Sequence, residues 1–254
     1  MFNPQRAVIF DMDGVLLDSY HAHWLSWAQS CSERGIGITP DQYKALFGQS
    51  FRAFADALSP RPLSDEELRA WDADKERQYR EIIERDFPAM PGATELIQAL
   101  QAAGFALGIA SSGPRENLDC LLRHLPGADR FKATVSANDT RQCKPHPEPF
   151  LTCARALGLA PARCVVIEDS IHGLIAARAA GMGTVGITGT CSAAELKPHA
   201  DMVVAALREL TPERVAELKP TTGSFVTSTE EESVDRITGF TGWNGAGFHH
   251  REGP

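Results

Sequence analysis

Short runs of apolar residues recur along the chain, and glycine, proline or polar residues bound most of them. Such uninterrupted runs are typical of strands in a parallel sheet that is covered on both faces. They predict strands at 6–10, 105–110, 133–136, 164–167, 184–187 and 201–204. Segments with helical spacing lie between them, at 93–103, 114–122, 149–157 and 173–180. This alternation predicts an α/β fold, a Rossmann-like doubly wound parallel sheet with right-handed crossovers.

The stretch from 20 to 87 has a different pattern and contains no convincing strand. Apolar residues from Trp24 to Cys31 follow the i, i+3, i+4, i+7 spacing of an amphipathic helix, which is expected to end at Gly35. A Ser-Asp-Glu-Glu capping box at 64–67 predicts a long helix that ends near 86. Shorter helices are expected at 40–47 and 51–58. An all-helical insertion therefore follows the first strand, and 88–92 is expected to be the hinge back.

These patterns predict three parts. Residues 1–17 and 91–220 form an α/β core, and 18–90 form a helical cap that is inserted into it. The segment 221–254 changes composition, because it is rich in Ser and Thr, then acidic, then rich in Gly. We expect it to be a tail that is flexible or docked on the core.

Two carboxylates stand at the end of the first predicted strand. Asp11 and Asp13 are two residues apart, and Gly14 follows them. Residues i and i+2 of an extended segment point to the same side, so the two carboxylates converge if the strand geometry continues through Met12. Like charges this close require a cation or a proton. Mg²⁺ fits this requirement, because it binds carboxylates together with a substrate phosphate.

Three later segments carry complementary groups. Ser111, Ser112 and Gly113 follow the second strand and offer donors to an anion. Lys144 lies in a stretch with three prolines, at 145, 147 and 149. Glu168 and Asp169 end the fourth strand. Because ligands bind at the carboxyl ends of the strands in open α/β sheets, we expect these groups to meet.

At these residues the chain resembles the haloacid dehalogenase superfamily. The run from Asp11 to Gly14 is similar to its first motif, Ser111 to its second, Lys144 to its third and the pair 168–169 to its fourth. The resemblance covers roughly residues 6–210, and the position of the insertion is similar to the helical cap of the β-phosphoglucomutase and phosphatase-like branch. The dehalogenase branch lacks the second aspartate, so Asp13 implies phosphate chemistry rather than carbon–halogen cleavage.

The resemblance also implies a role for each motif residue. Asp11 would attack phosphorus and Asp13 would act as general acid and base. Ser111, Ser112 and Lys144 would bind the phosphate oxygens. Mg²⁺ would be held by the Asp11 carboxylate, the Asp13 backbone carbonyl, Glu168 and Asp169.

The cap offers weaker candidates for substrate contacts. His21 flanks the first cap helix, and Arg52 resembles a cap arginine that grips a second phosphate in the mutase branch. The mutase loop looks like Lys-Gly-x-Ser-Arg, whereas 47–52 here has no lysine and displaces the arginine by one place. Lys44 is the sole early-cap lysine and lacks the context of the phosphonatases, which form a Schiff base.

The composition limits which classes of partner and which cell compartment we expect for this protein. The formal net charge is −8, and this excess of acid argues against nucleic acid as a partner. The six cysteines are scattered without a C-x-x-C pair, which is typical of reduced thiols in a cytosol and indicates no zinc site. The chain enters its first strand without a signal peptide, and no apolar run is long enough to span a bilayer. We expect a cytoplasmic protein that does not bind membranes.

The sequence therefore predicts an Mg²⁺-dependent phosphatase of small phosphorylated metabolites, such as sugar or polyol phosphates, that works through an aspartyl-phosphate. A phosphosugar mutase similar to β-phosphoglucomutase is the alternative. A regulatory protein that binds a phosphorylated ligand without turnover stays open, although a pure binder needs no nucleophile.

Overall fold

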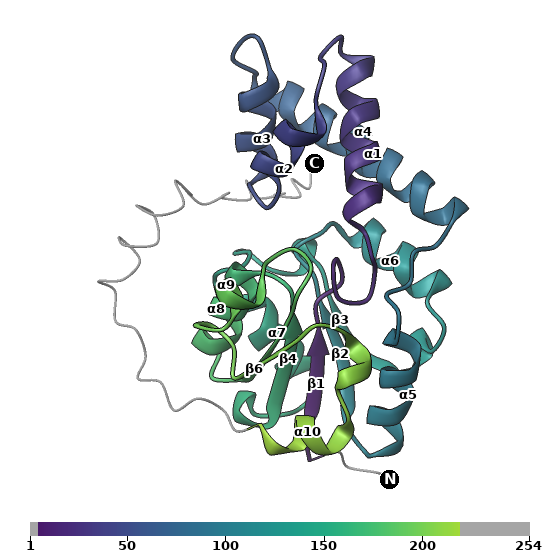
Figure 1. Ribbon diagram of the computed structural model, residues 1–254, viewed down its shortest axis with the longest axis vertical. Coiled ribbons are helices and arrows are strands. Elements are labelled where there is room, and N and C mark those ends of the chain that lie inside the picture. The colour runs from purple at the N-terminus through teal and green to yellow at the C-terminus, as the bar shows by residue number, and fades with distance from the viewer. Residues whose placement is uncertain (1–4, 219–254) are drawn as a thin grey trace, which may run out of the picture.

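The structure is a computed structural model that describes residues 5–218 (Figure 1). The predicted tail at 221–254 lies outside the described residues. The chain forms one parallel sheet with helices on both faces, and four helices stand above the sheet as a separate layer (Figure 1). The predicted fold class, a Rossmann-like core with an inserted helical cap, is confirmed.

The sheet has six parallel strands in the order β3-β2-β1-β4-β5-β6. All strands predicted from the apolar runs are present, and β3 begins a little earlier than predicted. The strand bounds are β1 (Ala7–Phe10), β2 (Ala106–Ala110), β3 (Phe131–Val135), β4 (Cys164–Glu168), β5 (Gly183–Ile187) and β6 (Met202–Val204).

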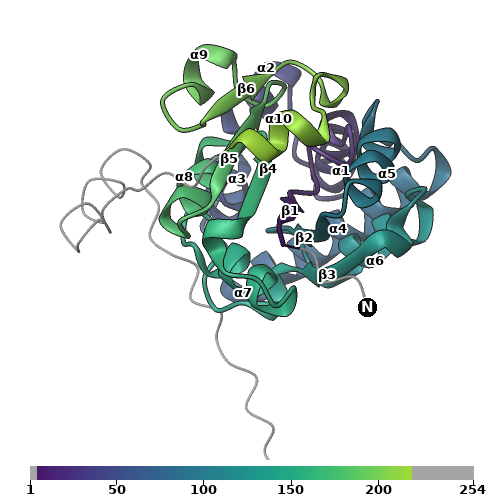
Figure 2. The same ribbon diagram turned by 90° about the horizontal axis from the view of Figure 1, so that it is seen from below.

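Both faces of the sheet are buried. In β1, Val8 and Phe10 point into one apolar cluster, whereas Ala7 and Ile9 point into the other. The first cluster packs under α5 (Ala93–Ala102) and α6 (Arg115–His124), and the second under α7 (Glu148–Ala156) and α8 (Ile171–Ala179). Figure 2 shows the two helix pairs on opposite sides of the sheet. This explains why the inner strands are almost entirely apolar, whereas the edge strand β3 alternates and exposes Lys132. Further short elements are η1 (Ala128–Arg130), η2 (Ala137–Asp139), η3 (Pro161–Arg163), α9 (Ala193–Leu196), η4 (Leu207–Glu209) and α10 (Pro212–Glu217).

The cap consists of α1 (Tyr20–Glu33), α2 (Pro40–Leu46), α3 (Phe51–Leu58) and α4 (Asp65–Arg85). Ser64 and Glu67 form the predicted capping box of α4. The cap has its own apolar core, in which the Trp27 ring stacks on Phe54 and meets Trp71 edge-on. The domain boundaries inferred from the sequence stay a prediction.

Helix α4 connects the cap to the core. Its 21 residues correspond to a length of about 32 Å. Trp71 in its first half belongs to the cap cluster, whereas Tyr79 and Ile83 in its second half belong to a sheet cluster. The chain passes between the core and the cap twice, once in each direction. These two connecting segments pair with each other, because the amide of Met90 donates to the Leu16 carbonyl at 2.9 Å. The cap is therefore joined to the sheet by one continuous helix and a short double connection.

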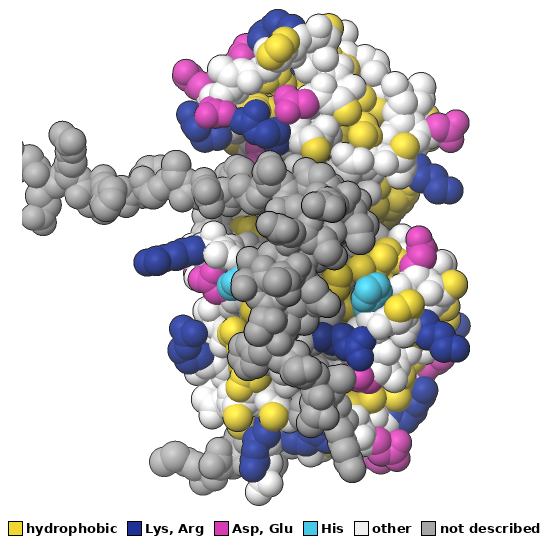
Figure 3. All heavy atoms as spheres, turned by 90° about the vertical axis from the view of Figure 1, so that its left-hand side faces the viewer, with side chains coloured by type: hydrophobic (Ala, Val, Ile, Leu, Met, Phe, Trp, Pro, Cys, Tyr) yellow, Lys and Arg dark blue, Asp and Glu magenta, His cyan; other side chains and the backbone are white. Residues whose placement is uncertain are grey.

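The described surface carries both signs of charge. On the face drawn in Figure 3, basic and acidic side chains are interspersed wherever grey atoms do not cover it. No helix within residues 5–218 has both the length and the apolar character that crossing a membrane requires.

Candidate active site

Segments from four parts of the chain meet at the carboxyl edge of the sheet. Asp11 follows β1, Ser111 follows β2, Glu168 is the last residue of β4, and Asp169 follows it. Lys144 comes from the loop before α7, and its ammonium group hydrogen-bonds Asp11 and, at 2.8 Å, Glu168 Oε1. Strand order reverses at β1, which is where ligands bind in doubly wound sheets. The predicted convergence of these distant residues is therefore present.

Three of these carboxylates form a compact cluster. Asp11, Glu168 and Asp169 are buried, and each offers an oxygen within 4.8 Å of the others. Burial raises the pKa of Asp11 to about 7, with the Glu168 charge adding to this and Lys144 opposing it. Burial also raises the pKa of Asp169 well above its usual value, and the charges of Glu168 and Asp11 add to the shift. The three carboxylates outnumber the single ammonium of Lys144, and their oxygen donors are of the kind that Mg²⁺ binds.

Two glycines leave room for the carboxylates of the cluster. Gly14 has φ +75°, and a Cβ there would lie 1.9 Å from Asp169 Oδ2. A Cβ on Gly173 would lie 1.8 Å from Glu168 Oε1. Glu168 Oε2 accepts a hydrogen bond from the Ser170 amide at 2.7 Å, so the carboxylate is fixed against α8. The absence of side chains at both glycines is a condition for the cluster's geometry.

Replacing Gly173 with alanine is expected to damage the cluster without weakening the helix. Alanine favours an α-helix by about 1 kcal/mol over glycine, but its Cβ displaces the Glu168 carboxylate. We expect the affinity for Mg²⁺ to fall about 10- to 100-fold, measured by titration calorimetry. Gly37→Ala is the matched control, because a Cβ there meets nothing within 4 Å. Unchanged affinity in Gly173→Ala would show that Glu168 does not contribute to the cation site.

Lys144 and Ser111 are buried beside the cluster. Burial alone lowers the pKa of Lys144, but the charges of Asp11 and Glu168 outweigh burial and raise this pKa above its usual value. The side chain is therefore a permanent cation, and its ammonium lies 4.8 Å from the centre of the Phe150 ring. Ser111 Oγ accepts a hydrogen bond from the Gly113 amide at 3.0 Å, whereas the neighbouring Ser112 is exposed.

Asp13 is separate from the carboxylate cluster and is held by the cap. The Tyr79 hydroxyl donates to Asp13 Oδ1 at 2.7 Å, and His23 Nε2 lies 3.3 Å from the same oxygen. The His23 and Tyr79 rings stack at 4.1 Å. Burial alone would raise the pKa of Asp13, but the hydrogen bonds that it accepts from His23, Tyr79 and Ser19 outweigh burial and lower this pKa below its usual value. The cap thus controls the orientation of this carboxylate.

The two predicted substrate contacts in the cap lie elsewhere. His21 is exposed on α1. Arg52 pairs with Asp65 within the cap and lies 4.0 Å from Asp56, with half of its side chain exposed. Within residues 5–218 no hydrogen bond or ion pair connects either residue to the cluster. Their roles stay predictions.

Sequence reasoning missed three contacts at the site. Tyr79 lies 66 positions from Asp13, and a buried tyrosine on a long helix is most simply read as core. Thr190, from the loop after β5, donates to Asp169, and its sequence context carries no motif. The contact of His23 could have been inferred from the sequence. The face of α1 that packs on α4 places His23, rather than the exposed His21, between the two helices.

The fold and site together define a hydrolase of the haloacid dehalogenase type. The model of the haloacid dehalogenase-like hydrolase family matches residues 5–181. The chain belongs to this family, and the predictions of the superfamily and of a hydrolytic enzyme are confirmed.

Individual relatives narrow the branch. Hexitol phosphatase B from Escherichia coli (strain K12) is 29% identical over 225 residues, which cover 83% of this chain and 97% of the relative. The crystal structure of β-phosphoglucomutase from Clostridium difficile has a TM-score of 0.72 and 28% identity, covering 84% of this chain and 96% of that one. Protein SUPPRESSOR OF QUENCHING 1, chloroplastic, from Arabidopsis thaliana is 33% identical over 199 residues. The match covers 75% of this chain but 18% of that longer protein.

Proposed function

We propose that this protein is an Mg²⁺-dependent phosphatase of small phosphorylated metabolites, sugar or polyol phosphates, that forms an aspartyl-phosphate on Asp11. One observation carries the proposal. The Asp11 carboxylate, the Lys144 ammonium and the Glu168–Asp169 pair meet at the carboxyl edge of the sheet, and a fourth carboxylate, that of Asp13, is held beside them by the cap. The similarity to hexitol phosphatase B supports a phosphorylated polyol or sugar as the substrate.

The buried groups divide into metal ligands and phosphate ligands. Asp11, Glu168, Asp169 and the backbone carbonyl of Asp13 would hold Mg²⁺, which when bound offsets the charge of the substrate phosphate. Lys144 is fixed between Asp11 and Glu168, so its ammonium is available to phosphate oxygens near Asp11. The Ser111 hydroxyl supplies a donor from β2. Both groups act electrostatically on the oxygens that carry charge in the transition state.

The reaction has two steps. An Asp11 carboxylate oxygen attacks phosphorus in line, the phosphorus–oxygen ester bond breaks, and its electron pair leaves on the alkoxide oxygen. Asp13 is ionised in the free protein, because the hydrogen bonds that it accepts lower its pKa. It takes up the proton that a phosphate monoanion brings into the site and gives this proton to the departing oxygen, so an alcohol leaves. In the second step a water molecule gives a proton to Asp13 and attacks the phosphorus of the aspartyl-phosphate. The bond between Asp11 and phosphorus then breaks, which frees inorganic phosphate and restores both carboxyl groups.

A phosphosugar mutase is the second candidate, because the structural match to β-phosphoglucomutase is close. A mutase must hold a substrate with two phosphate positions, and in this chain the cap arginine expected to do so, Arg52, pairs with Asp65. This pairing favours the phosphatase. Cleavage of a carbon–phosphorus bond and binding without turnover have no specific contact in their favour.

Phosphate release decides between these functions. We expect the purified chain to release inorganic phosphate from hexitol and hexose phosphates with Mg²⁺, and to lose at least about 10²-fold in rate when EDTA removes the metal. The panel should include β-glucose 1-phosphate with a trace of the bisphosphate. An isomeric sugar phosphate formed without free phosphate would favour the mutase. Tight binding of a phosphomonoester without any product would favour the regulatory protein.

A further inference from the structure

A core residue outside the predicted motifs contacts the cap helix at two points. Asn117 lies in the first turn of α6 and is 1% exposed. Its Nδ2 donates to Glu76 Oε2 at 2.6 Å, and its Oδ1 accepts from Arg80 at 2.9 Å. The orientation of the amide is unambiguous, because an arginine only donates and a carboxylate only accepts. Glu76 and Arg80 are one helical turn apart on α4, so a single amide fixes this helix against the core.

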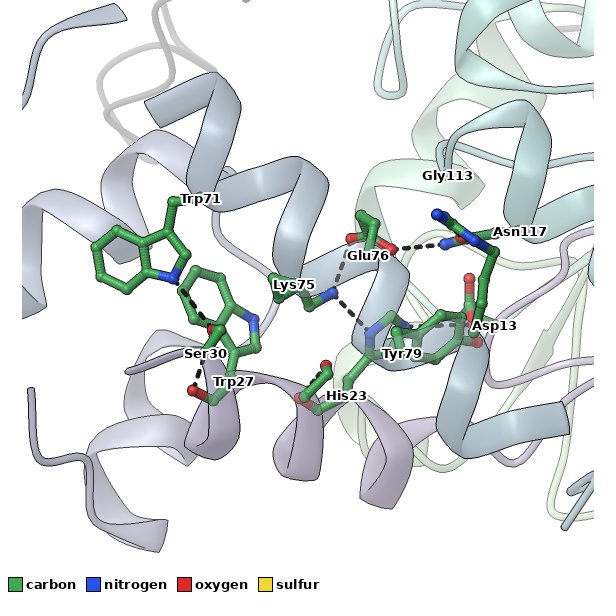
Figure 4. A network of polar contacts seen from close by, with 12 residues as sticks. Asp13, His23, Trp27, Ser30, Trp71, Lys75, Glu76, Tyr79, Gly113 and Asn117 are labelled. Atoms are coloured by element: carbon green, nitrogen blue, oxygen red, sulfur yellow. Dashed lines mark hydrogen bonds and ion pairs between the residues drawn. The ribbon is translucent and has the colours of Figure 1, made fainter. Parts of the chain in front are cut away.

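From Glu76 the contacts continue to the general acid and base. Lys75 Nζ donates to Glu76 Oε1 at 2.8 Å and lies 3.0 Å from His23 Nδ1. His23 Nε2 in turn lies 3.3 Å from Asp13 Oδ1. Figure 4 shows these side chains as a row that turns back at Lys75, because it leaves Asn117 through Glu76 and returns through His23 to Asp13.

The chemistry of each group decides which atom donates and which accepts along this row. A lysine ammonium has three donors and no acceptor, so the Nδ1 atom that faces Lys75 carries no proton. The ring proton of His23 is then on Nε2, where it is donated to Asp13. Lys75 is 4% exposed, and within the described part of the chain Glu76 is the one carboxylate that pairs with it within 4.0 Å, while the charge of Lys75 also acts on Asp72. Asn117 holds that carboxylate in place.

Asn117 also adjoins the proposed phosphate-binding loop. A Cβ on Gly113 would lie 3.3 Å from Ser111 Oγ and 3.8 Å from Asn117 Nδ2. The amide is therefore packed between the loop that is expected to bind phosphate and the cap helix that controls Asp13. A cap that separated from the core would break the contacts of Asn117 with Glu76 and Arg80.

We propose that Asn117 is a positioning residue, which through Glu76 and Lys75 sets the tautomer and orientation of the His23 ring that hydrogen-bonds Asp13. This inference rests on the proposed function, because it assigns Asp13 the proton that the leaving group receives. It predicts that the contact of Asn117 with Glu76 matters for substrates that need this proton and not for those whose leaving group is stable as an anion.

The contact between Asn117 and Glu76 can be tested by exchanging the amide and the carboxylate between the two positions. In Asn117→Asp two carboxylates face each other, although Arg80 keeps its acceptor. In Glu76→Gln the side chain has one acceptor for two donors, Lys75 and Asn117. In the double variant the new glutamine amide donates to the new aspartate and its oxygen accepts from Lys75, so both hydrogen bonds are rebuilt. Asn138→Asp is the matched control, because it adds the same charge near α6 at an exposed site.

In mildly alkaline buffer we expect each single variant to lose about tenfold in kcat/KM for a hexitol phosphate, which is the usual size of the coupling between two residues in contact. For p-nitrophenyl phosphate the loss in kcat/KM should be less than about threefold. The double variant should return to within about threefold of the unaltered chain. Equal losses on both substrates, or no recovery in the double variant, would overturn the proposal.

The His23 ring provides a readout that needs no turnover. Imidazole ¹⁵N shifts should show the proton on Nε2 in the unaltered chain, a mixture of tautomers in each single variant and Nε2 again in the double variant. An unchanged tautomer in all variants would contradict the proposal even if the rates fell. A chain that releases no phosphate from any substrate would overturn the proposed function, while the ¹⁵N result would still decide the role of Asn117.

Discussion

Asp11→Asn is expected to lower kcat for every phosphomonoester by about 10⁴-fold or more, because an amide cannot act as the attacking nucleophile. The substitution keeps the shape of the side chain and removes one of the three crowded carboxylates. Repulsion within the cluster therefore decreases, and the melting temperature should not fall. Initial rates of phosphate release, with the melting temperature measured beside them, separate lost chemistry from lost folding.

Trapping gives the same prediction a second readout. Acid quenching during turnover should leave a phosphorylated peptide that contains Asp11, and the Asn variant should yield none. Asp41→Asn, at an exposed position in the first turn of α2, is the control and should match the unaltered chain in rate and trapping. Substantial turnover in Asp11→Asn would mean that another group attacks phosphorus and would end the proposed mechanism.

The sheet could be predicted from the sequence, because strands that are buried on both faces are visible there as short runs of apolar residues. The inner strands are nearly apolar runs, and the reactive groups stand at the first polar positions at the ends of such runs, as Asp11 does after β1. The rule that ligands bind at the carboxyl ends of parallel strands then brings these positions together without knowledge of the strand order. That order, with β1 between β2 and β4, depends on long-range packing and was not predicted.

The cap side of the site could not be predicted, because its contacts are single side-chain contacts between helices. Whether Tyr79 reaches Asp13 depends on the rotation of α4 and on its angle to the sheet, and neither leaves a periodic signal. The same holds for Asn117 and Glu76, which are polar residues at positions that are equally compatible with solvent. The substrate contact by Arg52 was predicted from a resemblance and that by His21 from its place beside the first cap helix, and both residues lie at exposed positions.

Asp13→Asn is expected to produce an effect that depends on the leaving group. For a hexitol phosphate, kcat/KM should fall about 10²- to 10⁴-fold, because the departing alkoxide receives no proton. For p-nitrophenyl phosphate, kcat/KM should fall less than about tenfold, since a stable phenolate needs no general acid. Asp129→Asn, an exposed residue of η1, serves as the control and should change neither value.

The second step distinguishes Asp13 from a residue that only shapes the site. With p-nitrophenyl phosphate the Asn variant still transfers the phosphoryl group to Asp11, but it lacks the base that takes a proton from water. The aspartyl-phosphate should therefore accumulate, and stopped-flow absorbance should show a burst of phenolate followed by a slow steady rate. Equal losses on both substrates without a burst would assign Asp13 a structural role, held by Tyr79 and His23 for packing alone. A burst whose amplitude equals the enzyme concentration, together with the larger loss for the hexitol phosphate, would instead show that one carboxylate serves both steps, delivering a proton in the first and recovering one in the second.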